Sequence, residues 1–295
     1  MSETADRVHP TDHRMAIFGA GTMGAGITTL ALGHGIPVTL VDTDYGTLER
    51  ARTRIAHQTR AAQLMGAFPA DTEPAELTVA DSPDAVAEAT IVVEAVTENH
   101  STKVELLAKV GSLTTPGTVL VTNTSSIPVD ILAEHLTRPE ELAGVHFMNP
   151  PYLIRMVEVV RGPRTSETCL ENLARLLNTL GRESVMVTDS PGFVTSRLLH
   201  PMINDAVRLV QKGVATPEDV DNLMTGCLGH RTGPLRTADM IGLDNLVDSL
   251  KVLHERTGDE RCRPCDLLLN KVAEGHHGRK SGHGFFTYDA TETLA

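Results

Sequence analysis

Three glycines near the N-terminus constrain the fold of this chain more than any other feature. Gly19, Gly21 and Gly24 form the pattern Gly-x-Gly-x-x-Gly, directly after the apolar run Met15–Phe18. Where a strand turns into a helix, the first glycine permits the tight turn, the second lets the backbone approach a pyrophosphate, and the third lets helix and strand pack closely. The pyrophosphate lies on the helix N-terminus, where unpaired N–H groups and the helix dipole favour an anion. The pattern therefore predicts a dinucleotide-binding βαβ unit.

An acidic residue at the end of the next predicted strand indicates which dinucleotide is bound. Asp42 follows the run Ile36–Val41, 23 residues after the first glycine, where a carboxylate would bind the ribose 2′-hydroxyl. A 2′-phosphate would favour a nearby arginine, whereas Asp44 stands in that place. We therefore predict an NAD site that also includes Thr22 and Met23 of the glycine pattern. The alternative is a glycine turn in an α/β protein that binds no ligand.

Apolar runs alternate with helical patterns as far as residue 188, which predicts a doubly wound parallel sheet. The predicted strands are Met15–Phe18, Ile36–Val41, Ile91–Val93, Val119–Val121, Ala143–Phe147, Met156–Val160 and Ser184–Thr188. The predicted helices between them include Thr47–Gly66, Lys103–Val110, Val129–His135 and Glu167–Leu180. The alternation within Met156–Val160 is compatible with a strand at the edge of the sheet.

Helical patterns dominate the chain after residue 188. They predict helices over Phe193–Gly213, from Thr216, over Asn245–Glu255 and over Asp266–Ala273, with one strand pattern at Phe285–Tyr288. The predicted fold class is α/β, a Rossmann-like doubly wound sheet followed by a smaller all-α domain. We divide the chain into a disordered leader (1–14), an NAD-binding Rossmann-like domain (15–188) and a helical C-terminal domain (189–295).

Charge and composition exclude several other classes of protein. The chain has 26 Lys and Arg against 38 Asp and Glu, a net charge of −12, so we expect no basic surface for nucleic acid or an anionic membrane. No apolar run approaches the ~20 residues of a membrane-spanning helix, and the N-terminus lacks the apolar region of a secretory signal. Four cysteines do not make a disulfide scaffold, and the pair at Cys262 and Cys265 has no second pair at zinc spacing. We expect a cytoplasmic protein without a metal site.

Further motifs follow the glycine pattern in a fixed order. They are VVEAVTEN (92–99), NTSS (123–126), HFMNP (146–150), VEVV (157–160), DSPGFV (189–194), GPLRTADMIGLD (233–244) and GRKSGHGFF (278–286). With these motifs the chain resembles the L-3-hydroxyacyl-CoA dehydrogenase family, which includes short-chain 3-hydroxybutyryl-CoA dehydrogenases, over nearly its whole length from residue 15. The resemblance implies hydride transfer between NAD and C3 of a 3-hydroxyacyl thioester, and a homodimer formed through the helical domain.

The resemblance also implies roles for side chains in these motifs. His146 is identified as the general base for the substrate hydroxyl, and Glu158 as the carboxylate that holds its tautomer and stabilises the imidazolium. Ser125 matches the serine that hydrogen-bonds the reacting oxygen, and Asn149 matches an amide that helps to hold the His–Glu pair and the substrate. Glu98, Lys103 and Asn123 match family residues that line the cofactor cleft. Without the resemblance, His146 would be interpreted as a buried core histidine and Lys103 as a solvated lysine.

Three departures from the family pattern lie around the expected substrate site. Ser196 stands where the family usually has an asparagine before Arg197, and we count it with the catalytic residues because it can still donate a hydrogen bond. Arginines at positions 50, 52, 54 and 60 replace the lysines that coenzyme A-binding members often carry. Tyr152 and Arg155 lie between the predicted base and its carboxylate. These features resemble dehydrogenases of polyketide extender-unit pathways, which oxidise a glyceryl group on an acyl carrier protein.

Two further alternatives keep the cofactor site but change the function. One is a free hydroxy-acid dehydrogenase of the gulonate or carnitine type. The other is a non-catalytic NAD-binding protein, which the presence of Ser125, His146 and Glu158 disfavours. The expected partner is therefore an acyl-CoA or an acyl-carrier-protein thioester, and the sequence leaves the acyl chain length and the favoured direction open.

Overall fold

The computed structural model describes residues 13–289, which form two compact units. The first unit comprises the chain up to Thr124 together with Pro128–Ser190. The second comprises Ser125–Ile127 together with the chain from Pro191 onward. The predicted leader lies outside the described residues except for positions 13 and 14.

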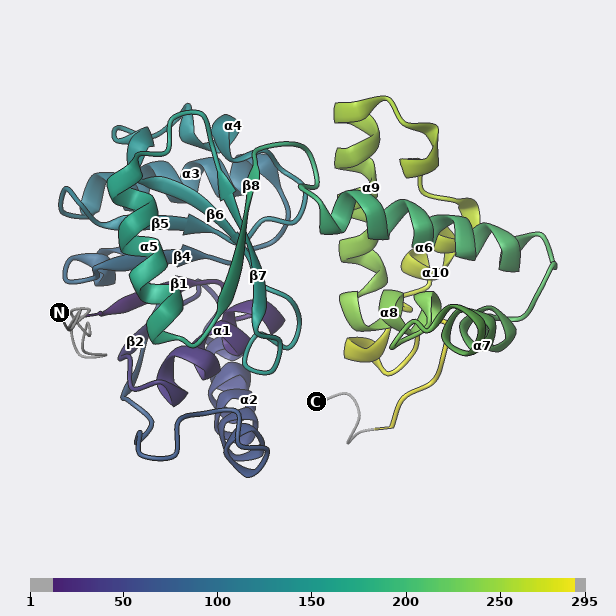
Figure 1. Ribbon diagram of the computed structural model, residues 1–295, viewed down its shortest axis with the longest axis horizontal. Helices are drawn as coiled ribbons and strands as arrows, with labels where there is room; N and C mark the ends of the chain where they lie inside the picture. Colours follow the sequence, from purple (N-terminus) through teal and green to yellow (C-terminus); the bar gives the residue numbers. More distant parts are fainter. Residues whose placement is uncertain (1–12, 290–295) are drawn as a thin grey trace, which may run out of the picture. The chain divides into compact units, whose positions relative to one another are not determined.

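An eight-stranded sheet forms the centre of the first unit (Figure 1). Its strands are β1 (Met15–Phe18), β2 (Val38–Val41), β3 (Leu77–Ala80), β4 (Ile91–Glu94), β5 (Val119–Thr122), β6 (Leu142–His146), β7 (Met156–Arg161) and β8 (Glu183–Thr188). They lie in the order β3-β2-β1-β4-β5-β6-β7-β8, with β1 to β6 parallel. The chain runs outward from β1 to β3 and then returns to β4 on the other side of β1. This reversal creates the switch point at which open α/β sheets bind ligands.

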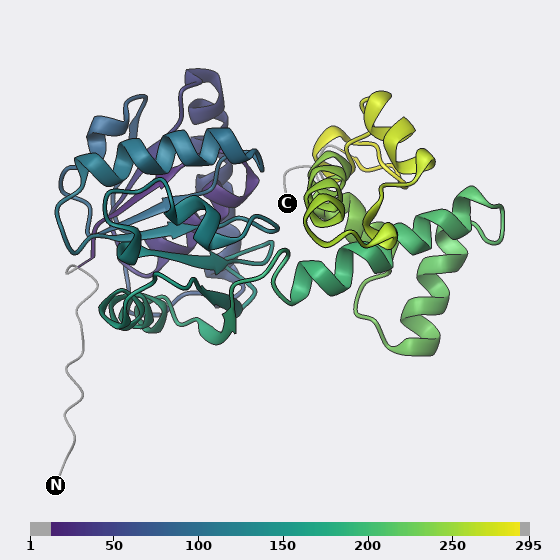
Figure 2. The ribbon, with the colours of Figure 1, turned by 90° about the horizontal axis from the view of Figure 1, so that it is seen from above.

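Helices cover both faces of this sheet. They are α1 (Thr22–Gly33), α2 (Tyr45–Leu64), α3 (His100–Leu113), α4 (Val129–Ala133) and α5 (Glu167–Thr179). Figures 1 and 2 show α5 on one face and α3 on the other. Strands β1, β4 and β5 are buried at every position, as parallel strands between two helical layers are. The predicted fold class is confirmed for this unit.

Five helices and two short 3-10 turns form the second unit. They are α6 (Thr195–Gln211), α7 (Pro217–Leu228), α8 (Pro234–Ile241), α9 (Leu243–Thr257), η4 (Glu260–Cys262), α10 (Asp266–Ala273) and η5 (Arg279–Ser281). Their core includes Ile203 and Val207 of α6 with Leu246, Leu250 and Leu253 of α9. No helix in the described part of the chain is both long enough and apolar enough to cross a bilayer.

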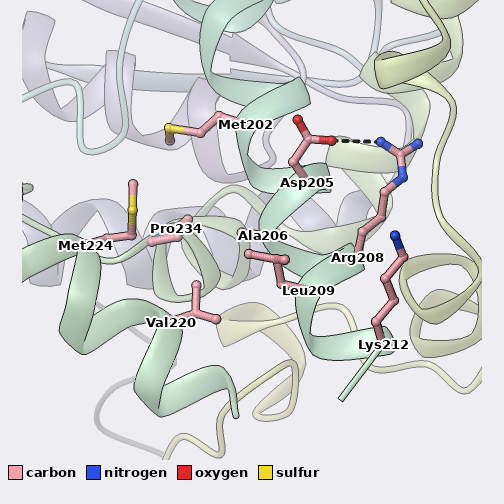
Figure 3. Close-up of a pocket in the computed structure, with 9 residues that line it drawn as sticks. All are labelled: Met202, Asp205, Ala206, Arg208, Leu209, Lys212, Val220, Met224 and Pro234. Carbon is pink, nitrogen blue, oxygen red and sulfur yellow. Dashed lines mark hydrogen bonds and ion pairs between the residues drawn. The ribbon is translucent and has the colours of Figure 1, made fainter. Parts of the chain in front are cut away.

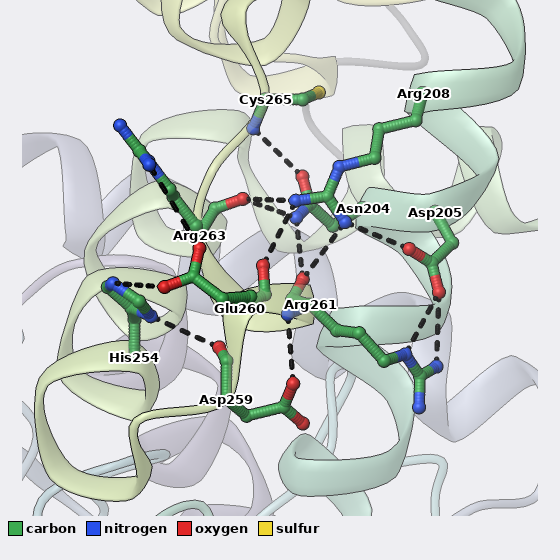
Figure 4. Close-up of polar contacts among 9 residues, drawn as sticks. All are labelled: Asn204, Asp205, Arg208, His254, Asp259, Glu260, Arg261, Arg263 and Cys265. Atoms are coloured by element: carbon green, nitrogen blue, oxygen red, sulfur yellow. Dashed lines mark hydrogen bonds and ion pairs between the residues drawn. The ribbon is translucent and has the colours of Figure 1, made fainter.

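A buried amide holds the cysteine-containing segment against α6 (Figure 4). Asn204 Nδ2 donates to the carbonyl oxygens of Arg261 and Arg263 at 2.8 and 2.7 Å, and Asn204 Oδ1 accepts the N–H of Cys265 at 3.1 Å. Cys262 and Cys265 are free thiols buried in the core of the unit. Within residues 13–289, no three His, Cys, Asp or Glu side chains are grouped to hold a metal ion.

The sheet differs from the prediction in two respects. Strand β3 is additional, and sequence patterns miss it because it is a short edge strand that is only partly buried. Strand β7 was predicted to be compatible with a sheet edge, but it lies between β6 and β8. It pairs antiparallel with β6 and parallel with β8, so the sheet is not parallel throughout.

The end of the second unit also differs from the prediction. Phe285–Tyr288 does not form a strand, and within it Thr287 makes only an isolated bridge, to His283. The N–H groups of Phe285 and Phe286 donate instead to the buried carboxylate of Asp239, each at 2.9 Å. Asp239 lies on α8, a helix that the sequence patterns did not predict. The aromatic run that predicts a strand is therefore an irregular segment anchored by the carboxylate of Asp239.

Candidate functional site

The functional residues of the first unit follow the carboxyl ends of successive strands. Gly19 follows β1, Asp42 follows β2, Glu94 ends β4, Asn123 follows β5 and His146 ends β6. Because these strands are parallel, their carboxyl ends lie along one edge of the sheet. The switch point between β1 and β4 lies within this row, so the residues flank the crevice where such sheets bind ligands.

The glycine turn has the geometry that the sequence pattern predicts. Gly19 has a φ of +96°, and a Cβ there would lie 2.5 Å from the carbonyl oxygen of Ala95, in the segment after β4. A Cβ on Gly24 would collide with the carbonyl oxygen of Gly19. A Cβ on Gly21 would meet no atom within 4 Å, and no side chain caps the start of α1. The turn thus presents an open, uncapped helix N-terminus that fits a pyrophosphate.

The carboxylate of Asp42 is fixed beside this turn. Its Oδ2 accepts the N–H of Ala20 at 2.8 Å, and its Oδ1 accepts the N–H of Asp44 at 3.0 Å. Asp44 itself caps α2 by accepting the N–H groups of Gly46 and Thr47. The carboxylates of Asp42 and Asp44 therefore fit the free ribose hydroxyls of NAD better than a 2′-phosphate.

His146 and Glu158 face each other across the antiparallel pair of β6 and β7. The imidazole Nδ1 lies 2.8 Å from the carboxylate Oε2, and both side chains are buried. Because a carboxylate only accepts hydrogen bonds, Nδ1 carries the hydrogen and Nε2 is left as the basic nitrogen. The spacing of 12 residues arises because the chain turns back on itself between the two strands.

The predicted site also includes two asparagines, Asn123 and Asn149. Asn123 Oδ1 accepts the N–H of Phe147 at 3.0 Å, which ties the end of β5 to the residue after His146. Asn149 is half-buried in the loop that leads to β7. Asn123 therefore holds the strand that presents the imidazole.

The two predicted serines belong to the second compact unit. Ser196 is buried in the first turn of α6. Ser125 begins the segment Ser125–Ile127, which is tied to its own unit where the N–H of Gly192 donates to the carbonyl oxygen of Ser126 at 3.2 Å. The structure thus groups Asn123, His146 and Glu158 in one unit and the serines in the other.

A buried ionic cluster lies under the carboxyl ends of β4 and β5. Lys103 Nζ is 2.6 Å from Glu94 Oε1 and 3.3 Å from Glu98 Oε2. Glu94 also accepts the hydroxyl of Thr122 at 2.7 Å, and Glu98 accepts the hydroxyl of Thr124 at 2.6 Å. Burial alone would lower the pKa of Lys103, but the two carboxylates outweigh burial and raise that pKa above its ordinary value. Lys103 is therefore a buried ammonium and not a solvated lysine.

Glu94 is the site residue that the sequence reasoning missed. It is fully buried at the end of a strand whose other residues are Ile91, Val92 and Val93. A buried carboxylate needs an ionic or hydrogen-bonding partner. The signal was therefore a single charged residue closing an otherwise apolar buried strand, and Lys103 nine residues later was the available cation.

A buried guanidinium clamps the loop between His146 and Glu158. Arg182 Nη1 donates to the carbonyl oxygens of Pro151 and Ile154, each at 3.0 Å. No carboxylate pairs with Arg182 in the part of the chain that the structure describes. Burial, with the positive charge of Arg155 nearby, lowers the pKa of Arg182 to about 10, so the group stays charged at neutral pH. The clamp fixes the loop by charge-assisted bonds to its backbone.

Replacing Arg182 with methionine should reduce the free energy of unfolding by about 2 kcal/mol, because hydrogen bonds from charged groups contribute roughly 1.5–3 kcal/mol. Arg182→Lys should recover part of the loss, since one ammonium can still reach one carbonyl. The matched control is Arg175→Met on the exposed surface of α5, where a change within about 0.5 kcal/mol is expected. Urea unfolding of the three variants measures this, and equal losses in Arg182→Met and Arg175→Met would contradict the clamp.

Nicotinamide-dependent dehydrogenases combine such a sheet edge with a positioned acid–base pair, and the first unit is of this class. The family model for the NAD-binding domain of 3-hydroxyacyl-CoA dehydrogenase matches residues 14–190, and the model for its C-terminal domain matches residues 192–288. The chain belongs to the 3-hydroxyacyl-CoA dehydrogenase family. It is an NAD-dependent oxidoreductase, as the resemblance of its motifs predicted.

Individual relatives cover almost the whole chain. A probable 3-hydroxybutyryl-CoA dehydrogenase of Bacillus subtilis is 37% identical over 280 residues, which are 94% of this chain and 97% of that protein. The crystal structure of FadB2 from M. tuberculosis is similar with a TM-score of 0.85 at 33% identity, over 94% of this chain and 99% of that one. The crystal structure of an NAD+-dependent 5-formyl-3-hydroxy-2-methylpyridine 4-carboxylic acid 5-dehydrogenase has a TM-score of 0.77 at 31% identity, over 95% and 92%.

Proposed function

We propose that the chain oxidises the 3-hydroxyl group of a short 3-hydroxyacyl-CoA to the 3-oxoacyl-CoA, with His146 as the catalytic base. The observation that carries the proposal is the 2.8 Å contact between His146 Nδ1 and Glu158 Oε2 at the edge that also holds the glycine turn. The choice of a short CoA thioester is supported by the B. subtilis relative, which is named for 3-hydroxybutyryl-CoA.

Gly19, Gly21, Gly24 and Asp42 would hold NAD, which would supply the acceptor for the hydride that leaves C3. His146 takes the hydroxyl proton at Nε2, and its ring becomes an imidazolium. Because Glu158 accepts from Nδ1, it keeps the productive tautomer and offsets the new positive charge. The family resemblance further suggests that Ser125 hydrogen-bonds the reacting oxygen, that Asn149 helps to hold the His–Glu pair and the substrate, and that Ser196 faces the substrate. It also suggests that the cofactor cleft is lined or supported by Thr22, Met23, Glu98, Lys103 and Asn123.

The test is NADH absorbance with three substrates in parallel: 3-hydroxybutyryl-CoA, a glyceryl group loaded on an acyl carrier protein, and free 3-hydroxybutyrate. We expect rapid NADH formation with the CoA ester. Formation with only the free acid would overturn the thioester assignment. NAD binding without turnover of any of the three would instead place the chain among non-catalytic NAD-binding proteins.

Formation of NADH only with the carrier protein would support the second candidate, an extender-unit dehydrogenase. The arginines of α2 favour this candidate, because an acidic carrier protein would meet a cationic helix. Ser196 favours it as a departure from the family pattern at the expected substrate site. Two of these arginines have carboxylates close by: Arg50 lies 3.4 Å from Asp44 and Arg52 lies 3.6 Å from Glu49. Since both pairs are exposed, either carboxylate can be exchanged for that of a partner at little cost.

We further propose that the enzyme is cytoplasmic, which the four free cysteines support. We also propose that it is a homodimer formed through the helical unit. The support is an apolar face on α6, where Leu198 and Leu209 are 71% and 45% exposed. They are eleven residues apart, about three turns, and so lie on one face of the helix. A hollow of about 400 Å³ adjoins this face (Figure 3). The hollow is lined by Met202, Asp205, Ala206, Arg208, Leu209, Lys212, Val220, Met224 and Pro234.

The dimer proposal predicts the effect of one surface charge. Leu198→Glu should convert the dimer to a monomer, because a carboxylate in the centre of an apolar interface is left without a partner. Leu64→Glu on the exposed end of α2 is the control, and it should leave the mass unchanged. Light scattering after size exclusion measures both. A wild-type chain that is already monomeric would contradict the proposal.

A further inference from the structure

We propose that the Glu94–Lys103–Glu98 cluster tunes which oxidation state of NAD the site prefers, by placing an excess negative charge under the nicotinamide. This inference rests on the proposed function and concerns groups that need not touch the cofactor. Two carboxylates share one ammonium, so the formal charge of the cluster is −1. The hydroxyl of Thr122 donates to Glu94, and that of Thr124 donates to Glu98.

Water has little access to this cluster, so its charges are weakly screened. The side chains of Lys103 and Glu94 are each only 1% exposed, while that of Glu98 is 12% exposed. The most outward charge of the three is therefore a carboxylate. Burial weakens screening by water and salt, so the negative potential of the cluster extends to a ligand bound above it.

The position of the cluster relative to the cofactor follows from the strand order. The pyrophosphate belongs at the glycine turn after β1, and the adenosine ribose at Asp42 after β2. The base His146 ends β6, and hydride and proton leave the same carbon–oxygen unit of the substrate. The nicotinamide must therefore lie between β1 and β6, above the ends of β4 and β5. Glu94 ends β4 and Thr122 ends β5, directly beneath this place.

Charge changes at this place when the reaction runs. The substrate C3–H bond breaks, its hydride with both electrons goes to the nicotinamide, and the hydroxyl proton goes to His146. The nicotinamide charge falls from +1 to 0 as the alcohol is oxidised to the ketone. A fixed negative charge attracts only the oxidised ring, so the cluster strengthens binding of NAD+ and leaves that of NADH nearly unchanged. It thereby opposes release of NAD+ before reaction without slowing release of NADH after it.

The test compares the dissociation constants of NAD+ and NADH for the purified full chain, by calorimetry and by nucleotide fluorescence. Glu98→Gln and Glu94→Gln each remove one negative charge and keep the side-chain shape. At an effective dielectric constant of about 20, loss of one unit charge on the order of 10 Å from a cation weakens its binding on the order of tenfold, so the ratio Kd(NAD+)/Kd(NADH) should rise by about that factor in both variants. The ratio cancels any lost hydrogen bond to the ribose, because both oxidation states carry the same ribose.

Asp42→Asn is the matched control, since it alters a carboxylate at the adenosine side. It should weaken both forms equally and leave the ratio unchanged. A ratio that also stays unchanged in Glu98→Gln, with both forms still bound, would overturn the inference while leaving the proposed function standing. If Glu94→Gln does not fold, Glu98→Gln alone decides, because its side chain is the more exposed. A wild-type chain that binds neither form would overturn the proposed function itself.

Discussion

Replacing His146 with alanine is expected to lower kcat by about a thousandfold and to leave the Kd for NAD unchanged. A positioned general base contributes roughly 10²–10⁴ to the rate, and the imidazole here is held by Glu158 at 2.8 Å. The cofactor contacts at β1 and β2 are separated from β6 by two strands, so they should survive the change. Single-turnover NADH formation gives the rate, and titration of the variant with NAD gives the affinity.

Two further variants make this expectation specific. Glu158→Gln keeps the shape of the side chain but can donate to Nδ1, which favours the wrong tautomer, so kcat should fall by about a hundredfold. His34→Ala is the control: His34 is also a buried histidine, bonded through Nδ1 to the carbonyl oxygen of Leu30. Its loss should cost stability and leave kcat within about twofold. A His146→Ala variant that retains kcat within tenfold would show that another group is the base.

The parts of the candidate site whose local geometry can be predicted from the sequence depend on neighbours in the chain. The glycine turn needs only its own six residues and the strand before it, and Gly19 indeed adopts a φ of +96°. Asp42 is placed by the length of α1 and the turn that follows. The predicted pairing of His146 with Glu158 came from the family resemblance, and the structure explains the spacing by the antiparallel register of β6 and β7.

The parts that the sequence does not predict depend on partners far along the chain. Strand β3 is only four residues long, is partly exposed and pairs only with β2, so that partner determines its place in the sheet. The direction of β7 is set by its partners β6 and β8, which local alternation does not encode. Phe285 and Phe286 have the composition of a strand, but Asp239, 46 residues earlier, takes the N–H of Phe285. In each case a tertiary contact overrides a local preference.

For the charged residues, too, the decisive contacts come from distant parts of the chain. Lys103 lies in an ordinary helical pattern, and nothing within its own helix distinguishes it from the exposed Lys109. Lys103 is buried because its ammonium pairs with the buried carboxylate of Glu94, which lies on β4. A sequence can reveal that a buried strand ends in an unpaired charge, but the fold decides which cation meets it.

Replacing Lys103 with methionine should lower the free energy of unfolding by about 3–5 kcal/mol, because breaking a buried ion pair leaves an uncompensated buried charge. The side chains of Lys103 and Glu94 are each 1% exposed, so water cannot take over the lost role. Lys109→Met, on the exposed face of the same helix, should change the free energy by no more than about 0.5 kcal/mol. The double variant Lys103→Met/Glu94→Gln should recover part of the loss, since it removes one of the stranded charges.

The pH dependence gives an independent check on the same ion pair. The folded chain holds the pKa of Lys103 above its ordinary value of 10.5. Above pH 10.5 the unfolded chain loses this proton first, so the folded state binds more protons and the free energy of unfolding falls as pH rises. The stabilisation is fully present below pH 10.5 and is lost as pH rises through the folded pKa. Urea unfolding from pH 8 to 11 should therefore show the difference between the wild type and Lys103→Met shrinking above pH 10.5, and a constant difference between them would contradict a charged pair.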